Sequence, residues 1–543
     1  MIHDEPGCKP GFGFSPHGDP MTRALPALVA GVLAFLAAPS TTPADAQTPP
    51  PTVLVLPYIQ PGDGPTLTGT DVKVICWITD QTPGTFVVEF ATTGGLVRTV
   101  QPARTKLDFP AYKAPVKILE IAPPPREVTG PPKTELAKES KEPKIPPPPE
   151  KDQHYFSYAA YLDNLPFNAD VTYRVKLGTT VIREATFRTR ATADRPVRFV
   201  LVGDLAQGRP AQKEVAFRIA QEKPEFLVAL GDIVYPSGRA NQYVAFYWGT
   251  YNNVAAAGPK AGAPLMATVP FYPVLGNHDI AARYPTVPDG LSVYRFFHVP
   301  RNGPGLGPWT TPVGKTGNDP AVAASFQAET GGNYPAIDAY SFDYGPTHIV
   351  ALNNNKGMAI DSPEFRKWLA ADLKGTSARW KLVCYHVPAF QSSKQHYAEQ
   401  QCRQLQPLFE ECGVDLVFAG HVHNYQRSVP LKFVPDGAGL VKGKVNGTFE
   451  LDTAFDGVTN TVPKGVIHIV AGGGGASLYG PGLDKVVDQL KKDHGANFAP
   501  YTAKHIVDRH SFVVLDATPD RLDFRALGAD GAELDRIAIT KTK

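Results

Sequence analysis

The stretch Val197–Asp204, with the sequence VRFVLVGD, decides the fold, because an apolar run ends there abruptly in Gly-Asp. Such a run is typical of a buried strand, and the Gly-Asp after it indicates a turn. Phe226–Tyr235, FLVALGDIVY, has the same arrangement, and Gln212–Gln221 between the two has a helical pattern. Strands that alternate with helices, here and around the helical stretch Pro363–Leu373, predict an α/β domain. We expect a layered sandwich of mixed β-sheets flanked by helices.

Further along the chain, three more apolar runs end in polar side chains. They are PVLGNHD at 273–279, WKLVCYH at 380–386 and VDLVFAGHVH at 414–423. A single Gly-Asp or histidine indicates no more than a turn or a polar loop residue. Five such strand ends in one chain predict one site, because chemistry in layered sheets lies in the loops at strand ends. Its candidate residues are Asp204, Asp232, Tyr235, Asn277, His278, His386, His421 and His423.

His421 and His423 stand two residues apart in GHVHNYQR, directly after an apolar run. In an extended segment, residues i and i+2 share a face, so both imidazoles point toward one site. Carboxylates, a phenol and imidazoles form a donor set that suits iron, zinc or manganese better than calcium or copper(I). The pattern is therefore typical of a metal site.

The order GD, GDxxY, GNHD, H and GHxH resembles that of the calcineurin-like metallophosphoesterases, and Tyr235 in GDxxY is typical of their purple acid phosphatase branch. The resemblance covers roughly Val197 to Pro430 and implies a metallophosphoesterase-like fold. It implies two ions bridged by Asp232: Fe(III) and a divalent zinc, iron or manganese ion. The ligands that it implies for one ion are Asp204, Asp232, Tyr235 and His423, and for the other Asp232, Asn277, His386 and His421.

Two neighbouring cations lower the pKa of bound water and clamp phosphoryl oxygens, which predicts direct hydrolysis of a phosphate ester by a metal-activated hydroxide. His278 is the histidine of the GNH motif, next to Asn277, and is the candidate general acid or phosphate contact. His396 matches the second of two substrate-contacting histidines in the plant-type enzymes. Gln395 stands in place of the first, which leaves one fewer cationic donor. Asp279 is expected to order its loop.

The region in front, residues 47–190, consists of short runs with alternating apolar and polar residues, which predict a β-sandwich. The phrase YLDNLPFNADVTYRVKLG, Tyr161–Gly178, resembles the fibronectin type III pattern. Residues 123–151 are rich in proline, lysine and glutamate and are predicted to form an insertion between two strands. We therefore expect a fibronectin type III-like sandwich at 47–190 and a catalytic domain at 197–543.

Residues 1–46 are predicted to be a leader that contains a signal peptide. A basic start at Met21–Arg23 precedes the apolar run Ala24–Ala38, and Ala44-Asp45-Ala46 has the form of a cleavage site. No later segment reaches the about 18 apolar residues of a membrane helix, so we expect a secreted or periplasmic protein. The net charge of +2 gives no reason to expect nucleic acid as the main partner. The sequence leaves a homo-oligomer open.

Several further features are interpreted as having no role in catalysis or binding. Asn424, Tyr425 and Arg427 are expected to pack their loop, and Ala471–Gly480, AGGGGASLYG, to be a flexible strand exit. Arg209 and Arg239 are expected at the solvated surface. The remaining residues with a structural interpretation are Asn353 to Asn355, expected to cap or turn, and His348, His468, His505 and His510. Cys402 and Cys412 flank a predicted helix, Arg403–Glu411, and no cysteine pairing is predicted.

The leading hypothesis is an exported dinuclear-metal acid phosphatase that hydrolyses small-molecule phosphate monoesters. A phosphodiesterase or nucleotide pyrophosphatase is the alternative on the same metal core. A catalytically silent secreted binding protein is the alternative from another class. Competent residues at every implied ligand position argue against the silent protein.

Overall fold

The computed structural model describes residues 49–109, 151–280, 288–307, 309–310, 320–437 and 439–541. The predicted leader lies outside these residues, as does the predicted insertion apart from Lys151. Within the described part of the chain, no helix is long and apolar enough to cross a membrane.

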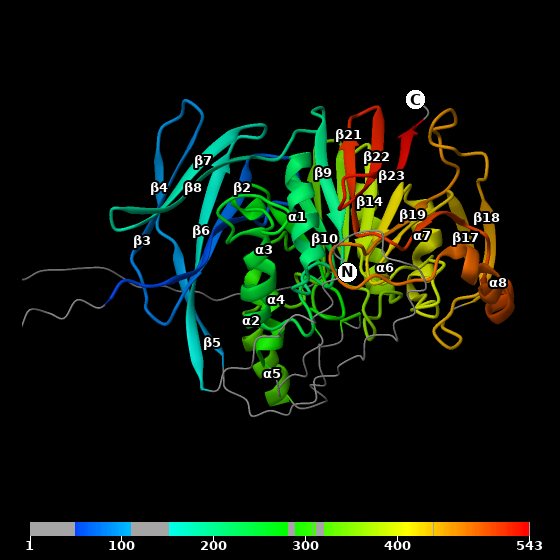
Figure 1. Cartoon of the computed structure of the whole chain (residues 1–543), viewed down its shortest axis with the longest axis horizontal. Coiled ribbons are helices and arrows are strands. Elements are labelled where there is room, and N and C mark those ends of the chain that lie inside the picture. The colour runs from blue at the N-terminus through cyan, green and yellow to red at the C-terminus, as the bar shows by residue number, and fades with distance from the viewer. Residues whose placement is uncertain are drawn as a thin grey trace, which may run out of the picture. The chain divides into compact units, whose positions relative to one another are not determined.

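Two β-sheets form the centre of the molecule (Figure 1). The six-stranded sheet has the order β11-β10-β9-β21-β22-β23. Its strands β9, β10 and β11 run parallel, and β21, β22 and β23 continue the sheet in antiparallel pairs. Its members are β9 (Val197–Val202), β10 (Phe226–Leu230), β11 (Phe271–Val274), β21 (Ser511–Ala517), β22 (Arg521–Gly528) and β23 (Glu533–Thr540).

The seven-stranded sheet has the order β12-β13-β14-β15-β19-β16-β20. Strands β13, β14, β15 and β19 are parallel, and the others pair antiparallel with their neighbours. Its members are β12 (Ala339–Tyr344), β13 (Thr347–Leu352), β14 (Trp380–Tyr385), β15 (Leu416–Ala419), β16 (Tyr425–Ser428), β19 (Ile467–Ala471) and β20 (Thr502–Ile506).

Alternation along these strands places the core between the sheets and beneath the helices. Phe199 of β9 and Leu382 of β14 belong to one apolar cluster that includes residues of both sheets. Val383, the neighbour of Leu382, packs instead on the other face with Leu369 of α6 (Pro363–Gly375). This arrangement of α1 (Pro210–Glu222), two sheets and α6 confirms the predicted layered α/β sandwich.

Local signals explain where α6 begins and ends. The Ser362 hydroxyl accepts a hydrogen bond from the Phe365 amide, and Pro363 occupies the first turn, where a missing N–H costs nothing. Lys374 in the last turn complements the negative end of the helix dipole. The other long helices are α5 (Pro320–Glu329) and α8 (Leu483–His494).

The shorter elements surround the sheets. They are the helices α2 (Ala240–Gln242), α3 (Gly249–Tyr251), α4 (Ser292–Phe296) and α7 (Gln406–Glu411), a π-helical segment at Tyr243–Trp248, 3-10 turns at Leu265–Ala267, Pro288–Leu291, Gln401–Leu405 and Gly495–Asn497, and the hairpin of β17 (Leu431–Pro435) with β18 (Gly447–Leu451).

The predicted first residue of the helix Arg403–Glu411 is wrong. A 3-10 turn, Gln401–Leu405, comes first and α7 begins only at Gln406. Pro407 explains the break, because proline fits the first turn of a helix and not its interior. Cys402 and Cys412, like the two other cysteines of the described residues, are free.

The front region is all β, as predicted. It consists of two four-stranded sheets with the orders β1-β2-β6-β5 and β4-β3-β7-β8. Trp77 and Tyr158 stack between them with ring centroids 5.2 Å apart. The strands are β1 (Val53–Gln60), β2 (Asp71–Thr79), β3 (Phe86–Thr92), β4 (Arg98–Val100), β5 (Ala103–Phe109), β6 (Gln153–Leu165), β7 (Asp170–Leu177) and β8 (Thr180–Arg188).

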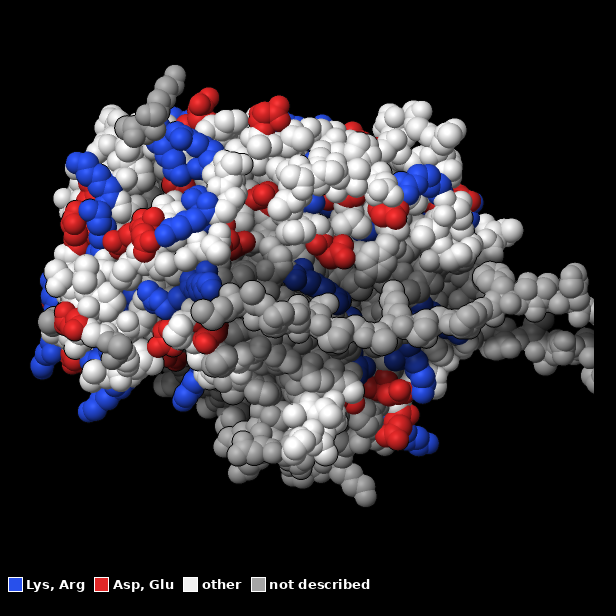
Figure 2. All heavy atoms as spheres, turned by 180° about the vertical axis from the view of Figure 1, so that it is seen from behind, with Lys and Arg blue, Asp and Glu red and all other residues white. Residues whose placement is uncertain are grey.

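The front sandwich is fixed to the segments that follow the strands of the six-stranded sheet. Arg183 of β8 donates to the Asn252 side chain at 2.6 Å, and Tyr58 of β1 donates to the Phe296 carbonyl at 3.4 Å. Positive and negative side chains are interspersed on the surface (Figure 2), in keeping with the net charge of +2.

Candidate dinuclear metal site

Loops at five strand ends bring the seven predicted metal ligands together. The loops after β9, β10 and β11 of the six-stranded sheet supply the acidic, phenolic and amide side chains. Those after β14 and β15 of the seven-stranded sheet supply the imidazoles. Hydrogen bonds join the loops of the two sheets: the Gly203 amide donates to the Ala471 carbonyl, and the His421 amide donates to Asp204 Oδ2 at 2.8 Å. The ligands are Asp204, Asp232, Tyr235, Asn277, His386, His421 and His423.

One group of side chains gathers around Asp204. The Tyr235 hydroxyl donates to Asp204 Oδ1 at 3.0 Å and lies 3.0 Å from His423 Nε2. His423 Nε2 lies 3.2 Å from the same Asp204 oxygen. Asp204, Asp232 and His423 each offer a ligand atom within 4.8 Å of one another.

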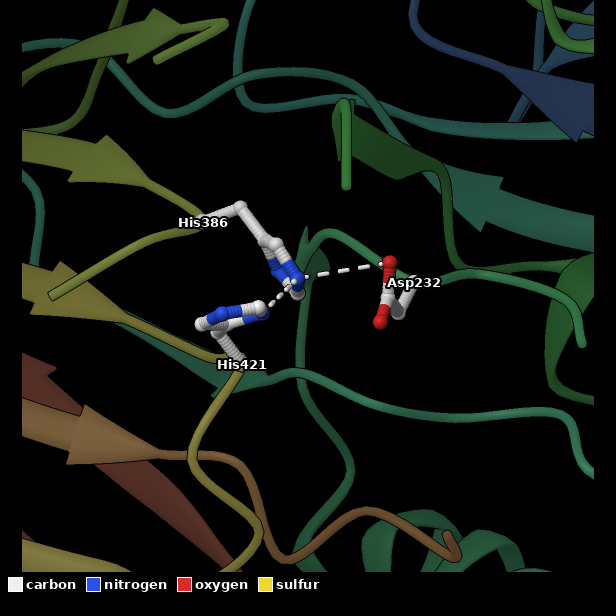
Figure 3. Close-up of side chains that lie close together, drawn as sticks. All are labelled: Asp232, His386 and His421. Atoms are coloured by element: carbon white, nitrogen blue, oxygen red, sulfur yellow. Dashed lines mark hydrogen bonds and ion pairs between the residues drawn. The ribbon is translucent and has the colours of Figure 1, made fainter. Parts of the chain in front are cut away.

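A second group gathers around His386 (Figure 3). Its Nε2 lies 3.3 Å from Asp232 Oδ1, 3.1 Å from Asn277 Oδ1 and 3.2 Å from His421 Nδ1. Asp232, His386 and His421 again place ligand atoms within 4.8 Å of one another. Asp232 is the residue common to both groups, so it stands where a bridging ligand is needed.

Each candidate ligand histidine turns its other ring nitrogen to a protein oxygen. His386 Nδ1 lies 2.8 Å from the Leu230 carbonyl, and His423 Nδ1 lies 2.7 Å from the Ser477 carbonyl. His421 Nε2 lies 3.2 Å from Glu399 Oε2. Such outer partners fix the tautomer and the ring orientation of metal-binding histidines. Each ring therefore turns its second nitrogen toward the cluster.

The backbone at the site is strained. Asp204, Asp232 and His421 have φ angles of 60°, 49° and 65°, in the left-handed region that favours glycine. Strain of this kind is kept mainly at functional sites. Gly231, at φ 84°, precedes Asp232, and a Cβ there would collide with the His386 ring. The loop therefore requires glycine next to the candidate bridging residue.

Buried charge dominates the electrostatics. Burial alone would raise the pKa of Asp232, but His386 and His278 outweigh it and hold the pKa of that carboxyl well below its usual range. Burial would lower the pKa of His386, and Asp232 instead raises it to about 9. Burial lowers the pKa of His421 to about 4. Without a metal ion His386 is therefore protonated near neutral pH, and an ion bound to Asp232 and His386 would displace that proton.

Asp279 orders the loops, as expected from the sequence. Its Oδ1 accepts the amides of Ile233 and Val234, and its Oδ2 accepts the Gly276 amide. Burial and the nearby Asp232 raise the pKa of Asp279 to about 8. This carboxyl joins the loop after β10 to the loop after β11.

The two predicted catalytic histidines flank the cluster. The His278 amide donates to Asp232 Oδ1 at 2.8 Å, and His278 Nδ1 lies 2.7 Å from the Pro236 carbonyl. Its side chain is 19% exposed, with Nε2 3.9 Å from Asp232 Oδ2. His396 packs its ring 4.0 Å from that of His421, and its Nδ1 lies 2.8 Å from Glu399 Oε1.

The structure adds residues that the sequence did not single out. Glu399 contacts both His396 and His421, and Tyr479 stacks on His423 with centroids 4.1 Å apart. Asn354, predicted only to cap or turn, accepts the amides of His386 and Val387. Of these residues, only Glu399 could have been suspected from the sequence, because it stands three residues after His396.

Two predictions for residues without an assigned functional role are wrong. Ala471–Gly480 is no flexible exit: the Gly474 amide donates to Gly203, and the Ala476 amide donates to Asp204. Arg239 is buried, and its guanidinium lies 3.0 Å from Asp289. Loop packing is confirmed for Arg427, which binds Asp535 through two nitrogens.

The donor set fits two first-row metal ions. Carboxylates, a phenol, an amide oxygen and three oriented imidazoles are hard to borderline donors, and they form two groups that share Asp232. Tyr235 and His423 contact Asp204, and Asn277 and His421 contact His386.

Comparisons with known proteins agree with this geometry. Residues 197–425 match the calcineurin-like phosphoesterase family. An uncharacterized protein of Mycobacterium tuberculosis is 26% identical over 351 residues, 59% of this chain and 58% of that protein. Purple acid phosphatase 18 of Arabidopsis thaliana is 25% identical over 269 residues, 48% of this chain and 51% of that protein. The purple acid phosphatase of Glycine max is 26% identical over 286 residues, 50% of this chain and 53% of that protein.

The match thus spans little more than half the length of these curated relatives. The fold resembles that of purple acid phosphatase PPD1 from yellow lupin seeds, with a TM-score of 0.54 and 18% identity over 89% of this chain and 74% of that chain. Residues 197–425 thus match the calcineurin-like phosphoesterase family, and the chain is similar to purple acid phosphatases.

Proposed function

We propose that the protein is an exported dinuclear-metal acid phosphatase that hydrolyses phosphate monoesters. The observation that carries this proposal is the convergence of seven donor side chains from five loops into two groups that share Asp232. The predicted signal peptide supports a secreted or periplasmic location.

We further propose which residues hold which ion. Asp204, Tyr235 and His423 would hold one ion, Asn277, His386 and His421 the other, and Asp232 both. A phenolate is a hard, anionic donor, which favours Fe(III) at the first position and a divalent zinc, iron or manganese ion at the second. Two such ions acidify water and neutralise the charge of a phosphoryl group during displacement.

The chain's own residues supply the proton for the leaving group. The Pro236 carbonyl holds Nδ1–H of His278, so Nε2 is the nitrogen free to carry a proton toward the ester. An imidazole titrates near neutral pH and therefore donates readily there. His278 is proposed as the general acid, and His396 as a second contact to the substrate.

The test is hydrolysis of an aryl phosphate monoester and its matched diester by purified protein supplied with iron and zinc. We expect turnover of the monoester that is lost in Asp232→Asn, because both ions need that carboxylate. We expect a visible absorption band that disappears in Tyr235→Phe, because the band arises from the phenolate on Fe(III).

Each alternative has its own outcome in this assay. Preference for the diester would replace the monoester proposal with a phosphodiesterase or nucleotide pyrophosphatase on the same metal core. Absence of turnover together with a metal-free, folded protein would favour the silent binding protein. A colourless wild type that contains iron would contradict the role of Tyr235.

A further inference from the structure

Tyr479 lies between the candidate metal ligands and the outer histidine. Its ring stacks on His423 with centroids 4.1 Å apart and planes 12° apart. On its other side, His396 lies 5.9 Å away at 29°, and His396 in turn packs 4.0 Å from His421. Tyr479 therefore borders both groups of ligands.

The loop that carries Tyr479 is fixed to the His423 segment. The Tyr479 amide donates to the His423 carbonyl at 2.8 Å, and His423 Nδ1 lies 2.7 Å from the Ser477 carbonyl. Two backbone contacts and the ring stacking hold the side chain in one place. A side chain held in this way is suited to contact a substrate, because a group that is already positioned loses little freedom on binding.

Gln395 completes the support of this loop. Its side-chain Nε2 donates to the Gly480 carbonyl at 3.1 Å, directly beside Tyr479. The Gln395 amide therefore anchors the loop at the residue next to Tyr479.

The Tyr479 hydroxyl has no hydrogen-bond partner among the described residues, and the side chain is only half-buried. Burial and then the carboxylates of Asp204, Asp232 and Glu399 raise the pKa of this phenol above its usual value, and a phenol that keeps its proton can donate a hydrogen bond. Its ring lies beside those of His423 and His396.

We propose that Tyr479 is a substrate-contacting residue whose hydroxyl donates a hydrogen bond to the phosphate ester, and that Gln395 is the positioning residue that holds it there. The proposal rests on the proposed function and adds a substrate contact to it.

The test uses the metal-loaded full chain with an aryl phosphate monoester as substrate and inorganic phosphate as a ligand. In Tyr479→Phe, kcat/KM should fall about five- to tenfold, mainly through KM, and phosphate affinity should fall by a similar factor, as expected for one lost hydrogen bond. Metal content should stay unchanged because the ring still stacks on His423. Tyr161→Phe, on the front sandwich, is the matched control.

A variant at position 395 separates the positioning role from a structural one. Gln395→Ala should raise KM with little change in kcat, because the hydroxyl is displaced and the ions are kept. An unchanged KM in this variant would contradict the positioning role of Gln395.

Unchanged phosphate affinity in Tyr479→Phe would overturn the substrate contact. Loss of metal from the same variant would also overturn it, since Tyr479 would then act only as support for His423. Calorimetric phosphate binding needs no turnover. A protein that binds metal and phosphate but hydrolyses no ester would therefore contradict the proposed function. The phosphate affinities of the wild type and of Tyr479→Phe would still test the contact between Tyr479 and phosphate.

Discussion

At the scale of single residues, the candidate site depends on which ring nitrogen each histidine turns inward. His386 and His423 present Nε2, whereas His421 presents Nδ1, and the opposite nitrogen is bonded to an oxygen in every case. His278 differs, because its Nδ1 is bonded to Pro236 and its Nε2 lies 3.9 Å from Asp232. The His278 ring is thus held through one nitrogen like the rings of the ligand histidines, but it belongs to neither group of ligands.

We expect His278→Ala to lower kcat about 100-fold or more, the usual contribution of a general acid. Metal content should stay unchanged, because the ligand groups do not include this imidazole. Steady-state kinetics and elemental analysis of the same preparation check both statements.

The control for this prediction is His154→Ala, which removes a half-buried imidazole from β6 of the front sandwich. It should keep the kcat of the wild type. An undiminished kcat in His278→Ala would remove this residue from the mechanism.

The sequence predicts the motif residues of the site and misses the residues that reach it from elsewhere. Asp204 and Asp232 end apolar strands, so the pattern exposes them. Tyr479 lies in a glycine-rich segment that resembles a flexible loop, and its position depends on contacts with His423. Glu399 likewise depends on the fold, which brings it to His421. Side-chain contacts between distant segments leave no periodic signal in a single sequence.

At the scale of elements, His348 ties a hairpin to a helix. It lies on β13 directly opposite Asp343 of β12, and its Nδ1 lies 2.7 Å from that carboxylate. Its Nε2 lies 3.0 Å from Asp372 of α6. Burial would lower the pKa of His348, but the two carboxylates raise it to about 9.

This histidine should make stability depend on pH. The pKa in the folded state exceeds the unfolded value of about 6.5, so the stabilisation is complete below that value and is lost as the pH rises through about 9. We expect the free energy of unfolding to fall between these limits, and to fall less in His348→Gln. Urea unfolding at several pH values measures both slopes, and parallel slopes would contradict the role of His348.

Elements follow from the sequence where one signal dominates. The buried strand β10 is a continuous apolar run, β9 is apolar except for Arg198, and Ser362-Pro363 marks the start of α6. The segment 401–411 has competing signals, because Pro407 interrupts a helical pattern, and there the predicted start of the helix is wrong. Local propensity does not decide a case in which turn chemistry and helical pattern disagree.

At the scale of the whole molecule, a buried cluster of charges joins the front sandwich to the α/β sheets. Asp71 accepts from Lys73 at 2.6 Å and from Arg190 at 2.8 Å, and all three side chains are buried. Arg190 also donates to the Asp343 carbonyl of β12 at 3.3 Å. Residues of β1 and β2, such as Val55 and Val74, belong to the same apolar cluster as β9.

We expect Asp71→Asn to destabilise the protein by about 3 to 5 kcal/mol, because it leaves two buried cations without their partner. Both parts should unfold in a single transition, since one apolar cluster spans them. Denaturant unfolding followed by tryptophan fluorescence measures the effect.

Asp163→Asn is the matched control, because it breaks an ion pair with Arg98 in which the side chains are 65% and 43% exposed. Exposed pairs contribute about 0 to 1 kcal/mol, so this variant should unfold like the wild type. Equal effects of the two variants would contradict the role assigned to the buried cluster.

The outer partners of the three ligand histidines differ in kind. Backbone carbonyls hold His386 and His423, while a side chain, Glu399, holds His421. A carbonyl is present whatever residue carries it, so point substitutions leave it in place. Substitutions at position 399 therefore change how His421 is held while every candidate ligand is kept.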